Sequence, residues 1–539
     1  MPAIITDQYR ILNAETFVDS FVGIGENRVN NYYSFLGHPN PTNTQVSNYG
    51  KSDWGNPIPD PIDAFDQESF YYDSMLFLKK ITEDDVRRVV PRNDWQNGTR
   101  YDMYRNNYSP DNRAPQSRST TLYESRYFVV NSQFNVYLCT NNGENPDNKD
   151  GQKSLFEPTH TNTVPAIAGN GSDGYMWKYL YTIAPSDIVK FVTSTYIPLP
   201  KKWGDTATAT IKDAAVDGKI ETVIIKNGGS GYKIDTLGIS TDTGSISGFR
   251  ISGDGEDGEV TVNISGGKVE SVSGIVGGSG YTFASIKFEG GSGEKTLLQG
   301  TDAQFEVVIP PKGGHGADIY RELGGFRVML YSKYDNNVDD APDYVLGNNF
   351  SRVGIIKNPL EFSGNALLNT TTATNLSSLK LKPDSLAGFT TSQVVYEPNT
   401  LITQTISTAG IGSTAVGYVA SWNPDTGILK YYQPVGFSTQ SLYSHKKLDF
   451  EGNNNNPPIT GGKLVEDGST ANLIVDTGFN DKKSITVGGK SVDLGQTFNL
   501  GKANPEIKKY SGEIIYIDNR APITRTTSQK EEVKIVIEF

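Results

Sequence analysis

Cysteine and histidine are scarce in this sequence. It has one cysteine, Cys139, so no disulfide can form within the chain, and its strand-like surroundings (134–139) predict a small buried apolar residue. None of the histidines has a second histidine or a cysteine at the spacing of metal ligands; they are His38, His160, His315 and His445. Nucleophile-elbow, Walker-type and HExxH motifs are also missing. We therefore predict no catalytic residue, no cofactor and no metal site, and a protein that is not an enzyme.

Long apolar runs and basic runs are missing too. No segment approaches the roughly 18 apolar residues that a spanning helix requires. Residues 1–7 lack the basic start and apolar stretch of a secretory signal. The net charge is -12, and basic residues cluster only in short pairs such as Arg87-Arg88 and Lys201-Lys202. A nucleic-acid surface needs a clustered positive footprint. We expect a soluble protein made in a cytoplasm, with no membrane insertion and no nucleic acid partner.

Aromatic and turn-forming residues are plentiful instead. Among 539 residues there are 29 tyrosines, 23 phenylalanines and 56 glycines. Aromatic side chains suit half-buried sheets, and glycine supplies the turns between short strands. The length exceeds what one hydrophobic core supports. The fold prediction is mainly β and multidomain: a β-sandwich-like core with a few short helices and two inserted β domains.

The first 204 residues have the fewest glycines and a mixed pattern. A helix capped by Asn13 is predicted over 13–21, and a second around 66–80, with a proline-rich loop (Pro39 to Pro61) between them. The predicted strands that follow are 121–130, 134–140, 175–183 and 189–198.

Residues 205–310 are rich in glycine and serine and contain an internal repeat. Gly-Lys-Ile-Glu-Thr-Val at 218–223 precedes Gly-Gly-Ser-Gly-Tyr at 228–232, and Gly-Lys-Val-Glu-Ser-Val at 267–272 precedes the same motif at 277–281. Both motifs recur after the same interval, which indicates duplication of one β unit. Neither Gly-Gly-Ser-Gly-Tyr motif opens a helix, which argues against a phosphate cradle.

A second β-like stretch spans 361–500. Residues 417–422 and 428–432 read as strands joined by the turn at 423–427, and 453–456 as a surface loop. The predicted organisation is a core made of 1–204, 311–360 and 501–539, interrupted by inserted β domains at 205–310 and 361–500.

The acidic turn Asp254-Gly255-Glu256-Asp257-Gly258 has the oxygen-rich composition that calcium prefers. It lacks the spacing of an EF-hand loop. We interpret it as a solvated hairpin turn, with a weak cation site as the alternative.

Four segments stand out together: Val90–Trp95 with Thr99–Tyr101, Gly171–Leu180, Gly354–Leu360, and Tyr510–Ile523 continuing to the closing strand. In this order they resemble the baseplate wedge subunit known as gene product eight in T-even-like contractile-tailed bacteriophages (myoviruses). They follow the family's order and lie outside 205–310 and 361–500. The chain is longer than short family members, and its glycine-rich insert with the exit Gly313–Gly316 is similar to versions from myoviruses of cyanobacteria.

The resemblance implies a structural protein of the virion. It would form a homodimer within each tail baseplate wedge, contact the other wedge subunits, and be assembled in the host cytoplasm. Its interfaces would repack when the baseplate rearranges and the contractile sheath shortens. The composition shift of the two inserts and their position between matched segments predict separate β domains on the exposed side. The repeated unit is expected to bind neighbouring tail proteins, with host glycans as the alternative.

The matched segments supply the candidate residues Trp95, Tyr175, Trp177 and Arg520. The three aromatics are interpreted as core, with contact to a neighbouring subunit as the alternative. Arg520 lies in Asn519–Ile523, predicted to be a turn between strands, where it would pair with a carboxylate or with main-chain carbonyls. The competing function is a glycan-binding or depolymerising tail protein. Only two repeat units are visible, which disfavours a long β-helix.

Overall fold

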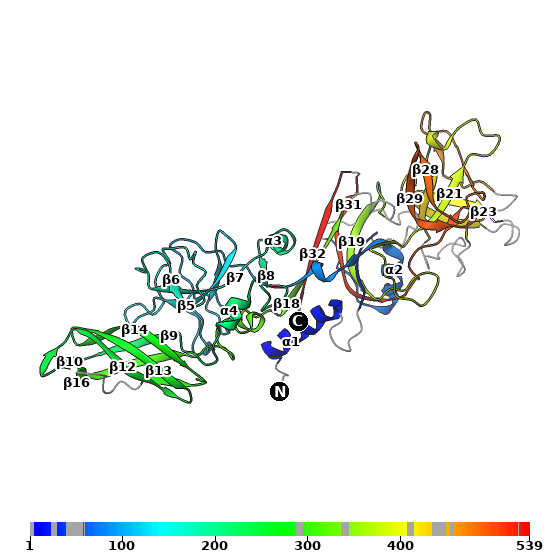
Figure 1. Ribbon diagram of the computed structural model, residues 1–539. Coiled ribbons are helices and arrows are strands. Elements are labelled where there is room, and N and C mark those ends of the chain that lie inside the picture. The colour runs from blue at the N-terminus through cyan, green and yellow to red at the C-terminus, as the bar shows by residue number, and fades with distance from the viewer. Residues whose placement is uncertain are drawn as a thin grey trace. The chain divides into compact units, whose positions relative to one another are not determined.

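The computed structural model describes residues 5–22, 30–38, 58, 60–286, 295–298, 300–335, 344–406, 414–433, 449–452, 457–526 and 528–539. Strands hold 44% of the residues and helices 10%, which confirms a mainly β, multidomain chain (Figure 1). Most of the predicted proline-rich loop, and the predicted loop at 453–456, lie outside the described residues.

The chain forms two compact units, each assembled from separated segments. Unit 1 comprises Met1–Val18, Arg87–Met329 and Ile535–Phe539, and unit 2 comprises Asp19–Val86 and Leu330–Lys534. The predicted insert 205–310 therefore falls within unit 1 and 361–500 within unit 2. The boundaries of both inserts stay predictions.

Helices are few and short in the described ranges. They are α1 (Asp7–Val22), α2 (Phe65–Ser74), α3 (Pro185–Phe191), α4 (Ala209–Asp213) and α5 (Ile319–Glu322), with 3-10 turns at Glu83–Asp85, Leu122–Glu124 and Thr391–Gln393. Asn13 lies inside α1 and does not cap it, so the predicted helix start was wrong by two turns.

Three elements predicted within the first 204 residues are only partly as predicted. The helix predicted over 66–80 ends at Ser74, and Met75–Ile81 forms strand β2, because these residues pair with β1 (Tyr32–Gly37) in the middle of a sheet. Tertiary pairing overrides the local helical pattern there. Within 121–130 only β4 (Phe128–Val130) is a strand, and 189–198 contains the end of α3 followed by β8 (Tyr196–Pro198).

Unit 1 has its main core around the four-stranded sheet β4-β5-β7-β6. Its strands are β3 (Val86–Pro91), β4, β5 (Asn135–Asn142), β6 (Ala166–Ile167), β7 (Tyr175–Thr182) and β8. Residues 135–142 are almost entirely buried, as expected for a central strand. Cys139 is buried there, which confirms its predicted place.

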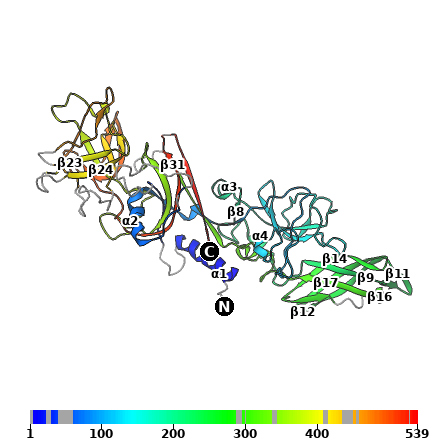
Figure 2. The same cartoon turned by 180° about the vertical axis from the view of Figure 1, so that it is seen from behind.

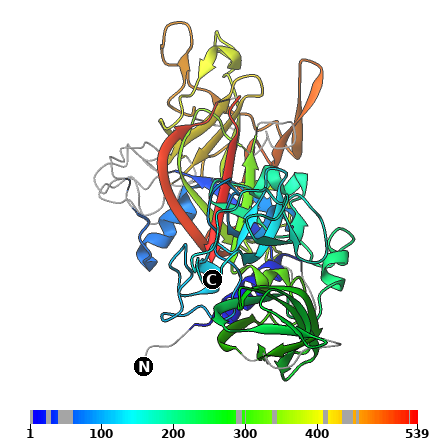
Figure 3. The same ribbon diagram turned by 90° about the vertical axis from the view of Figure 1, so that its left-hand side faces the viewer.

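The glycine-rich part of unit 1 has a core of its own, built from branched apolar residues, two tyrosines and Phe249. Its strands are β9 (Thr222–Ser230), β10 (Lys233–Thr236), β11 (Ile239–Thr241), β12 (Gly244–Gly253), β13 (Glu256–Ser265), β14 (Lys268–Ser279), β15 (Ala284–Ile286), β16 (Lys295–Leu298) and β17 (Thr301–Val308). β9 pairs with β17, and β14 with β13 (Figure 2). Seen nearly end-on in Figure 3, these green strands wrap around their core.

Unit 2 contains the sheet β20-β2-β1-β19-β31 and a larger sheet ordered β23-β24-β25-β21-β27. The turn predicted at 423–427 is confirmed, because it joins β24 to β25 with Asn423 opposite Ile428. The remaining strands of unit 2 are β19 (Asn349–Lys357), β20 (Thr372–Thr374), β21 (Ser377–Lys382), β22 (Val394–Val395), β23 (Leu401–Thr405), β24 (Thr414–Asn423), β25 (Ile428–Tyr432), β26 (Lys463–Leu464), β27 (Ile474–Val475), β28 (Lys482–Val487), β29 (Lys490–Phe498), β30 (Lys502–Ala503) and β31 (Glu513–Thr524). Two further strands, β18 (Arg327–Tyr334) and β32 (Glu531–Glu538), have residues in both units.

Candidate functional surfaces

The predicted aromatics Tyr175 and Trp177 lie at the centre of unit 1. Both side chains are fully buried, and their rings stack with centroids 5.3 Å apart. The Tyr175 hydroxyl donates to the Gln152 carbonyl at 2.9 Å and accepts from the Tyr101 amide at 3.0 Å. Burial raises the pKa of Tyr175 far above its ordinary value. These two residues therefore form the core and present no surface to a partner.

Trp95 occupies an intermediate position. It is half-buried against the same core, and its indole nitrogen donates to the Ser154 hydroxyl at 3.0 Å. The backbone amide of Trp95 also donates to the Val130 carbonyl at 2.9 Å. The side chain is therefore anchored at the edge of the core, with part of its ring open to solvent.

Arg520 lies on the surface of unit 2, with 65% of its side chain exposed, and pairs with Asp518 at 2.5 Å. The predicted turn at Asn519–Ile523 was wrong, because the whole segment runs inside β31. The register against β19 slips between the Asn519 and Ile523 pairings, which marks a β-bulge that accommodates Pro522. Proline is tolerated at bulges and on edge strands because its missing N–H removes no ladder bond there.

Three histidines lie in the described residues, and each is held by protein contacts. His315 Nδ1 lies 2.6 Å from Glu322 Oε1, whose other oxygen accepts from the Gly316 amide at 2.7 Å. His38 Nδ1 lies 3.0 Å from the Asn349 carbonyl. His160 packs edge-on against the Tyr137 ring, with centroids 5.5 Å apart, and burial lowers its pKa. His445 is outside the described residues. No cluster of three potential metal ligands occurs among the residues that the structure describes.

Glu322 was not found by sequence reasoning. Its side chain is buried and fastens the glycine-rich loop that carries His315, while Asp318 caps α5 by accepting from the Tyr320 and Arg321 amides. The available signal in the sequence was an acidic residue, Glu322, four positions after the helix-capping residue Asp318.

The acidic turn 254–258 joins β12 to β13, which confirms a hairpin. Hydrogen bonds from the Thr282 hydroxyl and amide lower the pKa of Asp254 to about 2, and the Phe283 amide adds a third donor. These donors occupy both carboxylate oxygens. Asp254 thus fastens 282–283 to the hairpin, which is a structural use of the charge.

A cluster of four charged residues joins the glycine-rich strands to the aromatic core. Lys226 on β9 lies 3.0 Å from both Glu144 and Glu306, and Arg105 pairs with the same two carboxylates. The Arg105 and Glu144 side chains are about 95% buried, so each charge needs its partners there. The four residues are widely spaced along the chain and carry no local motif, which is why the sequence did not reveal them.

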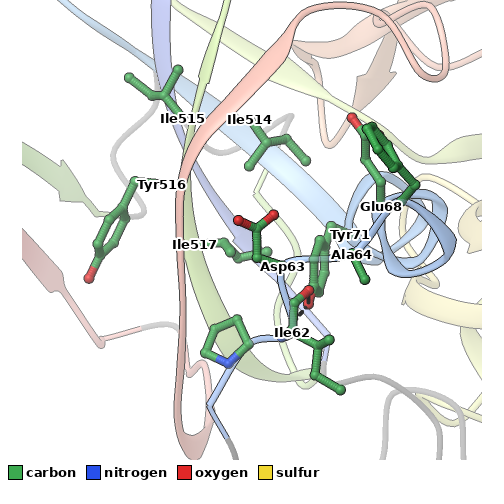
Figure 4. Close-up of a pocket in the computed structure, with 11 residues that line it drawn as sticks. Ile62, Asp63, Ala64, Glu68, Tyr71, Ile514, Ile515, Tyr516 and Ile517 are labelled. Atoms are coloured by element: carbon green, nitrogen blue, oxygen red, sulfur yellow. Dashed lines mark hydrogen bonds between the residues drawn. The ribbon is translucent and has the colours of Figure 1, made fainter.

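A groove runs along the outer side of β31 in unit 2, with a volume of about 780 Å³. It is bounded by residues 61–65, the first turns of α2 and Ile514–Ile517. Figure 4 shows Ile514 and Ile517 pointing toward Tyr71, whereas Ile515 and Tyr516 lie on the opposite side of the strand. The register slip opposite Ile355–Ile356 explains this arrangement, because a bulged residue breaks strict alternation.

Comparison of the chain with models of protein families and with curated proteins found no match. No helix in the described ranges is both long enough and apolar enough to cross a membrane.

Proposed function

We propose that the protein is a structural subunit of a contractile-phage tail baseplate wedge, that it forms a homodimer within the wedge, and that it performs no catalysis. Its role is to supply rigid surfaces to the other wedge subunits. Those interfaces repack between two arrangements when the baseplate opens.

The observation that carries the proposal is that the family-like segments meet in pairs inside each unit. In unit 2, Gly354 of β19 lies opposite Ile517 of β31, so the third and fourth segments form adjacent strands (Figure 1). In unit 1, Tyr101 contacts both Tyr175 and Trp177, with ring centroids 6.4 and 5.8 Å away. Short motifs matched by chance have no reason to pack against each other across long stretches of sequence.

The packing around these segments is suited to transmitting force. Tyr137, Tyr175 and Trp177 are fully buried in one cluster, and close-packed interiors deform little. A buried ion pair between Arg87 and Asp187, at 3.0 Å, further fixes the neighbouring elements of unit 1. Such a unit moves as a body, and the change between baseplate states then falls on its interfaces.

Reconstitution tests the proposal. The purified chain is mixed with the other wedge subunits of the same phage, and the mass of the products is measured by analytical ultracentrifugation. A stoichiometric complex containing two copies of this chain is expected. A chain that stays free under all conditions would contradict a wedge role, and release of sugars from host envelopes would favour the glycan-active alternative.

A deletion within the glycine-rich region provides a matched variant. Gly228 and Ala303 lie opposite each other in β9 and β17, so residues 229–302 can be replaced by an Asn-Gly turn. This keeps Lys226 and Glu306, which pair with the core. If the insert is peripheral, the shortened chain should join the wedge with unchanged stoichiometry. Loss of assembly by a folded variant would place a wedge contact on the insert.

A further inference from the structure

The groove beside β31 combines an exposed aromatic ring with acidic groups. Phe65, at the start of α2, is 96% exposed, and Ile62 is 60% exposed. Large apolar side chains this open to water gain from being covered. Both line the groove, so the apolar surface that would gain is concentrated at one place.

Among the described residues, the charged side chains that line the groove have a single sign. Asp63 and Glu68 line it, and no described lysine or arginine does. No hydrogen bond or ion pair to either carboxylate is formed by the residues that the structure describes. Figure 4 shows Asp63 beside Ile517, with the Tyr71 ring on its other side. An occupant that buries Phe65 would therefore bring its cationic groups to these two acids.

The strand edge itself argues against a second copy of the chain as the occupant. β31 is the last strand of its sheet among the described strands. Bulges at Ile515 and near Pro522 interrupt the flat ladder that edge pairing needs, so the edge is poorly suited to a regular added strand from a second copy.

We propose that this groove binds an extended segment of another polypeptide in which lysine or arginine alternates with apolar side chains. The apolar side chains cover Phe65 and Ile62, and the cations pair with Asp63 and Glu68. Recognition depends on side chains rather than on strand addition. The inference rests on the geometry of the groove and holds whether or not the protein is a wedge subunit.

Three capped peptides of about eight residues, roughly 26 Å when extended, test the inference on the full chain. One alternates lysine with valine, one replaces lysine by glutamate, and one replaces valine by serine. Fluorescence anisotropy should show the lysine–valine peptide binding at least about tenfold more tightly than either of the others. If the lysine–serine peptide binds as tightly, apolar contacts do not contribute and that half of the proposal is wrong. If the glutamate–valine peptide binds as tightly, the proposed pairing of cations with the acidic residues is wrong.

Local reporters locate the binding. In Phe65→Trp the new indole is exposed and should shift its emission to shorter wavelength when the lysine–valine peptide binds. Leu386→Trp is the matched control, because Leu386 is 94% exposed elsewhere in unit 2. A shift in the control alone, or in neither, would overturn the assignment to the groove.

Charge reversal completes the test. Asp63→Lys with Glu68→Lys should weaken the lysine–valine peptide by about tenfold or more, whereas Asp425→Lys, at an exposed turn of the same unit, should leave it unchanged. Circular dichroism verifies that the variants are folded. If the charge-reversed variant does not fold, the Phe65→Trp reporter still tests binding in the groove. If the reversal instead removes self-association of the chain, the occupant is a second copy and the proposal is wrong.

Discussion

Two regions of unit 1 bury their cores by different means. Around Tyr175 and Trp177 the space between strands is filled by large rings. In the glycine-rich region it is closed by bringing backbones together: a Cβ on Gly277 would lie 2.2 Å from the Ile220 carbonyl oxygen. The first region depends on large aromatic side chains that fill its core. The second also depends on glycines, whose missing side chains let the backbones approach closely. The rule that aromatic residues form the core therefore describes the first region but not the close backbone contacts of the second.

The comparison also explains how the duplicated unit is used. The leading glycine of each repeat lies against the closing Gly-Tyr of the other: Gly218 against Tyr281, and Gly267 against Tyr232. Each tyrosine hydroxyl accepts from a backbone amide of the turn it packs against, and Tyr232 accepts from Ala303 at 3.2 Å. Tyr281 donates to the Ile251 carbonyl at 2.9 Å and accepts from the Gly258 amide at 3.1 Å. The two copies therefore interlock, and neither completes its own fold.

Replacing the largest ring should have the largest effect. Trp177→Ala removes a fully buried side chain from the aromatic core, and the cavity left behind should lower the free energy of unfolding by about 3–5 kcal/mol. Ile167→Ala is the control on neighbouring β6, where the side chain is 52% exposed, and should cost below about 1 kcal/mol. Urea denaturation followed by circular dichroism measures both. Equal losses would show that the core is not close-packed.

Adding a methyl group should be the most damaging change in the glycine-rich region. Gly278 and Gly229 have positive φ, and a Cβ would lie 2.1 Å from the Glu256 oxygen and 2.3 Å from the Thr301 oxygen, respectively. Each change to alanine should cost about 2–4 kcal/mol, from backbone strain and displacement of the paired strand. Gly266→Ala, with positive φ but open space, should cost only about 1 kcal/mol. If the cost at Gly266 is as large as at the other two glycines, backbone strain alone accounts for the lost stability and the close contacts do not contribute.

Removing single hydroxyls tests whether the two repeats are equivalent. Tyr281→Phe leaves the Gly258 amide and the Ile251 carbonyl without this partner, at an expected cost of about 1–3 kcal/mol. Tyr232→Phe removes the acceptor of the Ala303 amide, at an expected cost in the same range. Chemical denaturation of the two variants compares the two costs directly. A cost at one tyrosine several times that at the other would contradict equivalent roles in the two repeats.

The smallest effect concerns the charges that join the two regions. Burial alone would raise the pKa of Glu306, but Arg105, together with hydrogen bonds from Lys226 and Asn107, lowers it overall. A carboxyl whose pKa is depressed by folding stabilises the protein above its unfolded pKa, and this contribution is lost as pH falls through the folded value. Wild type should therefore lose more stability than Glu306→Gln between neutral and acid pH. Parallel pH profiles from thermal unfolding would contradict this role for Glu306.

Local chemistry was enough to predict several features. The interval shared by the two repeat motifs predicted a duplicated β unit, and Asn423–Gly427 predicted a hairpin whose strands the structure pairs. Turn residues act within a few positions, so a single sequence records them. The predicted boundaries were wrong where pairing with a strand distant in the sequence determines the structure. Met75–Ile81 is a strand because it pairs with β1, and Asn519–Ile523 is extended because it lies in β31 beside β19.

The candidate surfaces divide in the same way. The sequence determined that the chain is mainly β, that Cys139 lies within a buried strand, and that one segment is duplicated. Only the tertiary structure decided that Tyr175 and Trp177 are enclosed while Arg520 is exposed, because burial depends on what packs from elsewhere in the chain. It also extended the repeat: Gly255–Gly258 and Gly300–Ala303 make equivalent turns, with positive φ at Asp257 and Asp302. The two turns differ in amino-acid sequence because they require only a certain backbone conformation and close approach of neighbouring backbones. Several residue types meet that requirement.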